Sequence, residues 1–150
     1  MKARAGLATL LFSATALPLA AQQHFEKTIP FPRRGTARLN WSVDRCSVDS
    51  LEVRNYPDEE DIEKARRSNP DDHSWLWWQF NVENRSDRKC RIRVWIEVLD
   101  KNGNVVKSGD KSDTVDAGKV DDEIRVSGRM KTIDAAGSPK VRVRAEIGPK

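Results

Sequence analysis

The fold is decided by residues 74–98, whose sequence is SWLWWQFNVENRSDRKCRIRVWIEV. Apolar and polar residues alternate on both sides of a turn-forming cluster at 84–88. The apolar positions are Leu76, Trp78, Phe80 and Val82 before the turn, and Cys90, Ile92, Val94, Ile96 and Val98 after it. Because successive side chains of a strand point to opposite faces, this pattern predicts two strands that each turn an apolar face toward a core.

Weaker patterns of the same kind flank this stretch. Further strands are expected over 36–44, 46–55, 104–107, 124–126 and 141–147. The strand at 46–55 is irregular, which a β-bulge would explain. A tight hairpin is expected at 100–104 and a loop at 134–139. Together these segments predict an all-β sandwich of about seven strands.

Residues 56–73 interrupt the β pattern with one short helix. Acidic residues crowd 58–61 and basic residues follow toward 67, an order that complements the dipole of an α-helix. We therefore expect a helix over 58–67. Its only apolar residues are Ile62 and Ala65, so this helix is expected at the surface. The acidic residues are interpreted as a solvated helix start, because no calcium-loop spacing follows them.

The first 21 residues have the layout of a secretory signal peptide. Lys2 and Arg4 precede an apolar stretch at 6–17, and small residues follow at 20–21. A membrane-spanning helix needs about 20 apolar residues, so an anchor is the poorer interpretation. We expect a periplasmic or secreted protein with no membrane insertion after signal cleavage.

The rest of the chain is expected to be an extended N-terminal arm at 22–35 and a single domain at 36–150. Pro30 and Pro32 favour extended backbone in the arm. The chain has 27 basic and 23 acidic residues, and both basic residues of the signal peptide leave with it, so the remainder carries a net charge of +2. An excess this small argues against nucleic-acid binding, which usually needs a strongly basic patch.

Both cysteines, Cys46 and Cys90, lie in the exported part. An even number of cysteines in an oxidising compartment predicts a disulfide between them, with two buried thiols as the alternative. Only His24 and His73 accompany them, at no recognisable ligand spacing, so a zinc site is not expected. The sequence indicates no metal and no cofactor.

Residues 78–126 resemble FxLYD-type and related immunoglobulin-like domains of bacterial exported proteins. The similarity rests on the strand and Asn-x-Ser turn at 79–86, the strand and hairpin at 94–106, and the small-residue turn at 115–119. The literal Phe-x-Leu-Tyr-Asp motif is absent, and residues 97–100 only approximate its end. The resemblance implies an immunoglobulin-like β-sandwich that serves as an adhesion, scaffold or accessory module, and it carries over no catalytic residue.

The sequence favours a binding protein over an enzyme. It contains no Gly-x-Ser-x-Gly elbow, no His-Glu-x-x-His and no glycine-rich phosphate loop. Neither His24 nor His73 has the context of a catalytic base, and the adjacent acids at 121–123 are interpreted as solvated. We therefore predict no catalytic residues.

The predicted binding residues are aromatic and basic, and lie opposite the apolar face. They are Trp75, Trp77, Trp95, Arg91 and Arg93. If the two strands pair, these side chains lie side by side, either as a contact surface for a protein or cell-envelope glycan or as a cation–π ladder that stiffens the sheet. Two other functions stay open. One is a periplasmic inhibitor or immunity protein that uses the acidic loop at 58–72, and the other is a small envelope hydrolase that uses carboxylates.

Overall fold

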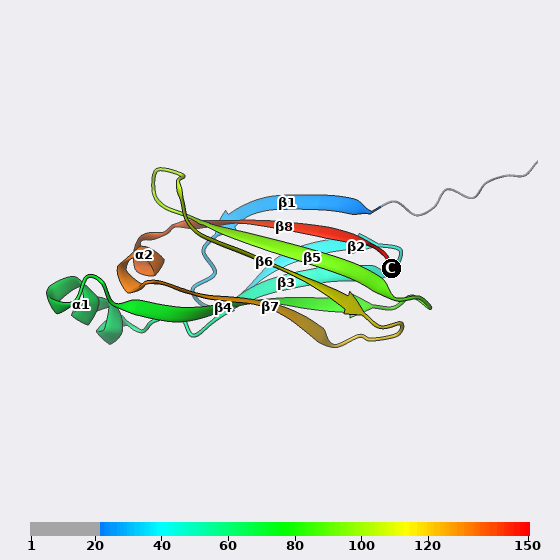
Figure 1. The fold of residues 1–150 in the computed structure, drawn as a ribbon, viewed down its shortest axis with the longest axis horizontal. Helices are drawn as coiled ribbons and strands as arrows, with labels where there is room; N and C mark the ends of the chain where they lie inside the picture. Colours follow the sequence, from blue (N-terminus) through cyan, green and yellow to red (C-terminus); the bar gives the residue numbers. More distant parts are fainter. Residues whose placement is uncertain (1–21) are drawn as a thin grey trace, which may run out of the picture.

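The computed structural model describes residues 22–150, which form two packed four-stranded antiparallel sheets (Figure 1). Sheet A has the strand order β1-β8-β5-β6, and sheet B has the order β2-β3-β4-β7. The strands are β1 (Gln23–Pro30), β2 (Thr36–Val43), β3 (Cys46–Arg54), β4 (His73–Asn84), β5 (Cys90–Leu99), β6 (Val105–Val115), β7 (Asp122–Lys131) and β8 (Lys140–Pro149). The predicted all-β sandwich is confirmed, and the predicted signal peptide lies outside the described residues.

The core fills the space between the two sheets. The predicted apolar faces of β4 and β5 both point into it, and Trp78, Phe80 and Val94 are fully buried. β3 contains the expected irregularity, a register shift between Val48 and Ser50 in its pairing with β4. Period-two alternation therefore identified the buried faces of the central strands correctly.

Three segments differ from the sequence-based expectations. Residues expected to form an arm ahead of the domain provide β1, which pairs along its whole length with β8. β6 continues to Val115, well beyond the short strand expected there, and residues 132–137 form a helix where a loop was expected. Residues 107–114 contain no apolar side chain and so show no alternation of apolar and polar residues. The reason is that β6 is an edge strand that is exposed along most of its length.

A glycine on β6 lets this edge approach sheet B. A Cβ atom at Gly109 would lie 2.7 Å from Cγ1 of Val126 on β7, so any other residue there would force a shift. β6 and β7 therefore lie close together at this edge, although they belong to different sheets.

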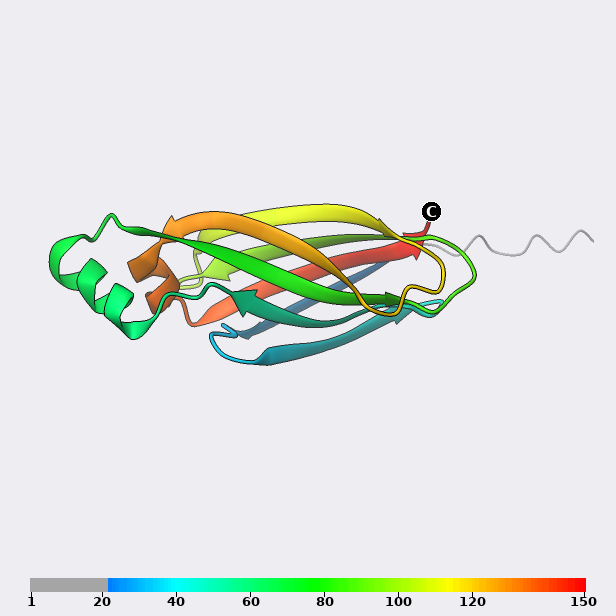
Figure 2. The ribbon, with the colours of Figure 1, turned by 90° about the horizontal axis from the view of Figure 1, so that it is seen from below.

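The two helices lie together at one end of the sandwich (Figures 1 and 2). α1 (Glu59–Ser68) begins where the acidic cluster predicts, and Asp58 caps it by accepting a hydrogen bond of 2.8 Å from the Asp61 backbone N–H. Ala65 is the one buried residue of α1, which agrees with the expected surface helix. In α2 (Thr132–Gly137), the side chains of Thr132 and Ala135 are buried.

The predicted disulfide joins the two sheets at the other end. Cys46 begins β3 and Cys90 begins β5, and their Cα atoms are 6.5 Å apart. Both side chains are buried. A disulfide of this kind is typical of proteins outside the reducing cytoplasm.

Candidate binding surfaces

The five predicted binding residues do not share one surface. Trp75 and Trp77 lie on β4 in sheet B, whereas Arg91, Arg93 and Trp95 lie on β5 in sheet A. The expectation of a single Trp/Arg surface is therefore wrong. Alternation specifies the face on which a side chain lies but not the neighbouring strand, and the connection between β4 and β5 crosses from one sheet to the other.

The outer face of sheet A is a ladder of aromatic and charged side chains around Trp95. Trp95 lies opposite Arg144 of β8 on one side and Asp110 of β6 on the other. The guanidinium carbon of Arg93 is 4.7 Å from the centroid of the Trp95 ring, and that of Arg144 is 5.8 Å away. Both arginines therefore make cation–π contacts with this tryptophan.

Acidic side chains hold the arginines of this face in place. Arg93 donates a hydrogen bond of 2.9 Å to Asp110, and Arg142 and Arg144 each donate one of 2.9 Å to Glu97. These ion pairs hold the charged side chains within the sheet, so the outer face of sheet A has the form of the predicted cation–π ladder. Arg91 is exposed and makes no ion pair with the described residues.

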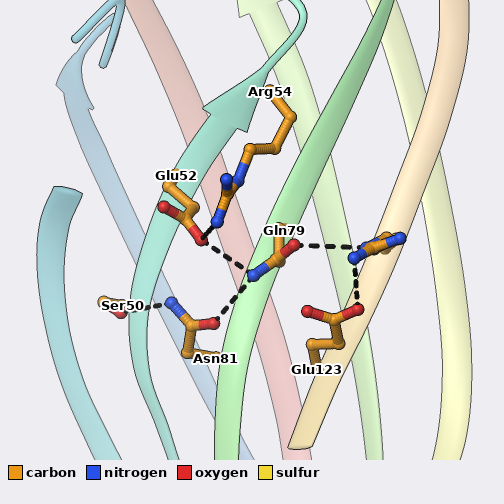
Figure 3. A network of polar contacts seen from close by, with 7 residues as sticks. Ser50, Glu52, Arg54, Gln79, Asn81 and Glu123 are labelled. Atoms are coloured by element: carbon orange, nitrogen blue, oxygen red, sulfur yellow. Dashed lines mark hydrogen bonds and ion pairs between the residues drawn. The ribbon is translucent and has the colours of Figure 1, made fainter. Parts of the chain in front are cut away.

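The outer face of sheet B is built on a buried glutamine. Gln79 is 5% exposed, and its Nε2 donates hydrogen bonds of 2.8 Å to Glu52 and 3.2 Å to Asn81 (Figure 3). Its Oε1 accepts one of 3.2 Å from Nε of Arg125. The network thus joins β3, β4 and β7 across the sheet.

Further contacts extend this network to both sides. Asn81 donates a hydrogen bond of 3.0 Å to Ser50, Arg54 pairs with Glu52 at 2.8 Å, and Arg125 pairs with Glu123 at 2.6 Å (Figure 3). A network whose polar groups are satisfied stiffens the surface that carries it. No local pattern indicates this role of Gln79, because its partners on β3 and β7 are 27 and 46 residues away.

Trp75 is the least covered large apolar side chain on either face. Trp77 lies between Arg54 of β3 and Ser127 of β7, but β3 ends there, so Trp75 has a cross-strand neighbour only on β7, namely Arg129. Trp75 is consequently 50% exposed, whereas Trp77 is partly buried beneath Arg125, whose guanidinium carbon is 5.5 Å from its ring. Arg129 is exposed and makes no ion pair with the described residues.

An ion pair fixes the chain next to Trp75. Lys131 on β7 donates a hydrogen bond of 2.9 Å to Asp71, just before β4. This bond, together with the attraction between the charges, lowers the pKa of Asp71 and raises the pKa of Lys131. The loop that leads into Trp75 is thus attached to the neighbouring strand.

The two histidines lie on different sheets. His24 pairs with Glu146 on sheet A at 3.2 Å, whereas His73 begins β4 on sheet B. In residues 22–150 no three His, Cys, Asp or Glu side chains gather as metal ligands, and no helix there is long and apolar enough to cross a membrane.

Comparison with known proteins adds little. No protein-family model and no curated protein matches this chain. Among solved structures, the chain is similar to the enzymatically active domain of tailspike protein 4 from bacteriophage CBA120, with 9% identity and a TM-score of 0.24. The match covers 86% of this chain and 17% of the tailspike chain, and a likeness at this level carries no conclusion about function.

Proposed function

We propose that this protein is an exported, non-catalytic binding module of the cell envelope that contacts a protein or glycan through the outer face of sheet B. The observation that carries the proposal is Trp75, a large side chain left half exposed where β3 ends. Exposed aromatic surface marks interaction sites, and tryptophan and arginine are the residues most enriched among binding hot spots.

The surroundings of Trp75 support this role. Arg129 lies directly beside it with its guanidinium free of ion pairs to the described residues. The Gln79 network holds the adjacent part of the sheet rigid, so a partner that docks there has little conformational entropy to remove. The disulfide and the predicted signal peptide support a periplasmic or secreted location.

An inhibitor or immunity protein is the second candidate. α1 projects from the end of the sandwich at which β4 begins (Figure 2), and Glu59, Glu60 and Asp61 form its first turn. These acidic residues would suit a basic partner.

Affinity capture with matched variants tests the proposal. Immobilised mature protein, its Trp75→Ala variant and its Arg91→Ala variant would be incubated with an extract of the cell envelope and of its purified glycans. We expect retention by the wild type and by Arg91→Ala, and a loss of at least tenfold in Trp75→Ala, since truncating a hot-spot residue removes about 2 kcal/mol or more. Equal retention by Trp75→Ala would overturn the assignment of this surface. Turnover of a retained glycan would contradict the non-catalytic function.

A further inference from the structure

A groove of about 520 Å³ lies beside the disulfide, at the end of the sandwich away from α1. This volume falls in the range of small-ligand pockets. The groove is bounded by the turn at 44–45, the loop at 86–89 and residues 148–149, with both disulfide cysteines in its lining. It is remote from Trp75, so it is independent of the function proposed for sheet B.

The loop wall of this groove is held in one conformation by Asn84, which is fully buried. Its Nδ2 donates hydrogen bonds of 2.7 Å to the Arg88 carbonyl and 3.0 Å to the Val115 carbonyl. Its Oδ1 accepts bonds of 3.0 Å from the Ser86 N–H and 2.6 Å from the Ser86 hydroxyl. All the polar groups of this amide are satisfied, so the wall is organised before any ligand arrives.

The opposite wall is a two-residue hairpin turn with an unexpected residue in it. Asp44 and Arg45 join β2 to β3, and both have positive φ, 47° and 66°. Turns of this kind strongly favour glycine at the second position, because a Cβ is strained in left-handed backbone. The Arg45 carbonyl accepts a hydrogen bond of 2.8 Å from the Arg85 N–H, but glycine would provide the same carbonyl. The backbone therefore gives no reason for an arginine here, and strain of this kind is characteristic of functional sites.

The Arg45 side chain lines the groove and makes no ion pair with the described residues. Two other cations, Arg88 and Lys89, line it as well, against the carboxylates of Asp44 and Asp87. Arg88 forms a long ion pair of 3.8 Å with Asp87, and both side chains are largely exposed. Lys89 forms an ion pair of 3.2 Å with Asp116, which lies outside the lining. Of the two guanidinium groups in the lining, only that of Arg45 has no ion-pair partner among the described residues.

We propose that this groove binds a small ligand that carries a carboxylate or phosphate group, with Arg45 as the anchor of that group. A guanidinium pairs with either group through two parallel N–H donors, which gives both affinity and orientation. Val43, Pro149 and the disulfide provide apolar contacts for the body of the ligand. The strain at Arg45 is retained because glycine, which would remove it, would also remove the anchor.

Titrations with phenyl phosphate, benzoate and benzyl alcohol, followed by NMR of the backbone amides, test this site. We expect both anions to shift the amide signals of Arg45, Arg88 and Lys89, and benzyl alcohol to shift them far less. The stronger of the two anions then identifies phosphate or carboxylate as the preferred group. Absence of shifts with both anions, or equal shifts with the neutral alcohol, would overturn the proposal.

Arg45→Gly separates this role from a structural one. We expect this variant to bind the anions at least tenfold more weakly and to melt a few degrees higher, because glycine relieves the positive φ. Asn55→Gly is the matched control, since Asn55 also has a positive φ, 58°, but lies at the other end of β3. It should leave anion binding unchanged. A lower melting temperature in Arg45→Gly, or unchanged binding, would contradict the assignment.

Discussion

The outer faces of the two sheets carry the same kinds of residue, but the neighbours of these residues differ. On sheet A, Trp95 has strands on both sides, and its arginine neighbours are held by Asp110 and Glu97. On sheet B, Trp75 extends past the end of β3 and has a neighbour on one side only. A tryptophan on an outer face is therefore a structural element or a free surface according to whether its neighbouring strands reach it.

The largest expected effect separates both outer faces from the core that they share. Val94 is fully buried between the sheets, so Val94→Asp should unfold the domain, because an unpaired buried charge costs several kcal/mol against a total stability of about 5–15 kcal/mol. Arg91→Asp, on the outer face of the same strand, should stay folded. Circular dichroism and urea denaturation of both variants would measure this. The reverse order of stabilities would show that the faces of β5 are assigned the wrong way round.

Removing the disulfide should have the next largest effect, because it joins the sheets that carry the two faces. It closes a separation of 44 residues, so the double variant Cys46→Ala, Cys90→Ala should lose about 2–5 kcal/mol. Intact mass with and without reductant before alkylation checks the bond, and urea denaturation gives the loss. A loss below about 0.5 kcal/mol, the size of an ordinary surface change, would contradict it.

The two tryptophans themselves give a smaller, more specific difference. Trp95→Ala should cost about 2 kcal/mol, because it removes a partly buried ring and two cation–π contacts. Trp75→Ala should cost about 0.5 kcal/mol or less, since the ring is half exposed. Thermal and urea denaturation of the pair measure this difference. Similar losses in the two variants would mean that Trp75 is as structural as Trp95.

The smallest expected effect is the pH dependence of two aspartate side chains, one beside each sheet. The Lys131 hydrogen bond lowers the pKa of Asp71 near sheet B, and the backbone N–H of Asn104, followed by that of Asn102, lowers the pKa of Asp100 in the β5–β6 hairpin. Because both pKa values are lowered, each carboxylate stabilises its loop above the ordinary value of 3.8, and the contribution is lost as the pH falls through the lowered pKa.

Salt distinguishes these two acids, because an exposed ion pair is screened more than bonds to backbone N–H groups. NMR titration at about 0.05 M and about 0.5 M salt should move the pKa of Asp71 toward its ordinary value and leave that of Asp100 nearly unchanged. Asp71→Asn should make the hydrogen-exchange protection around residues 71–73, measured relative to the intrinsic exchange rate at each pH, independent of pH in this range. Equal salt dependence of the two pKa values would show that Lys131 does not hold Asp71.

Local patterns predicted the faces of the strands but not their neighbours. The alternation at 76–82 and 90–98 was sufficient to identify the core, and the charge order at 58–67 was sufficient for α1. The separation of β4 and β5 into different sheets depends on long-range pairing, which leaves no periodic trace in the sequence. Most of β6 was missed because an exposed polar edge strand shows no apolar alternation. The buried amide of Gln79 was missed because its partners are distant in the chain.

The central claim is that the free aromatic surface of this protein is Trp75 on sheet B and not Trp95 on sheet A. Limited oxidation with N-bromosuccinimide, mapped by peptide mass spectrometry with and without the retained envelope fraction, tests it directly. We predict that Trp75 reacts first in the free protein and becomes protected when the fraction is added, while the reactivity of Trp95 does not change. Protection of Trp95 with continued reactivity of Trp75 would contradict the account.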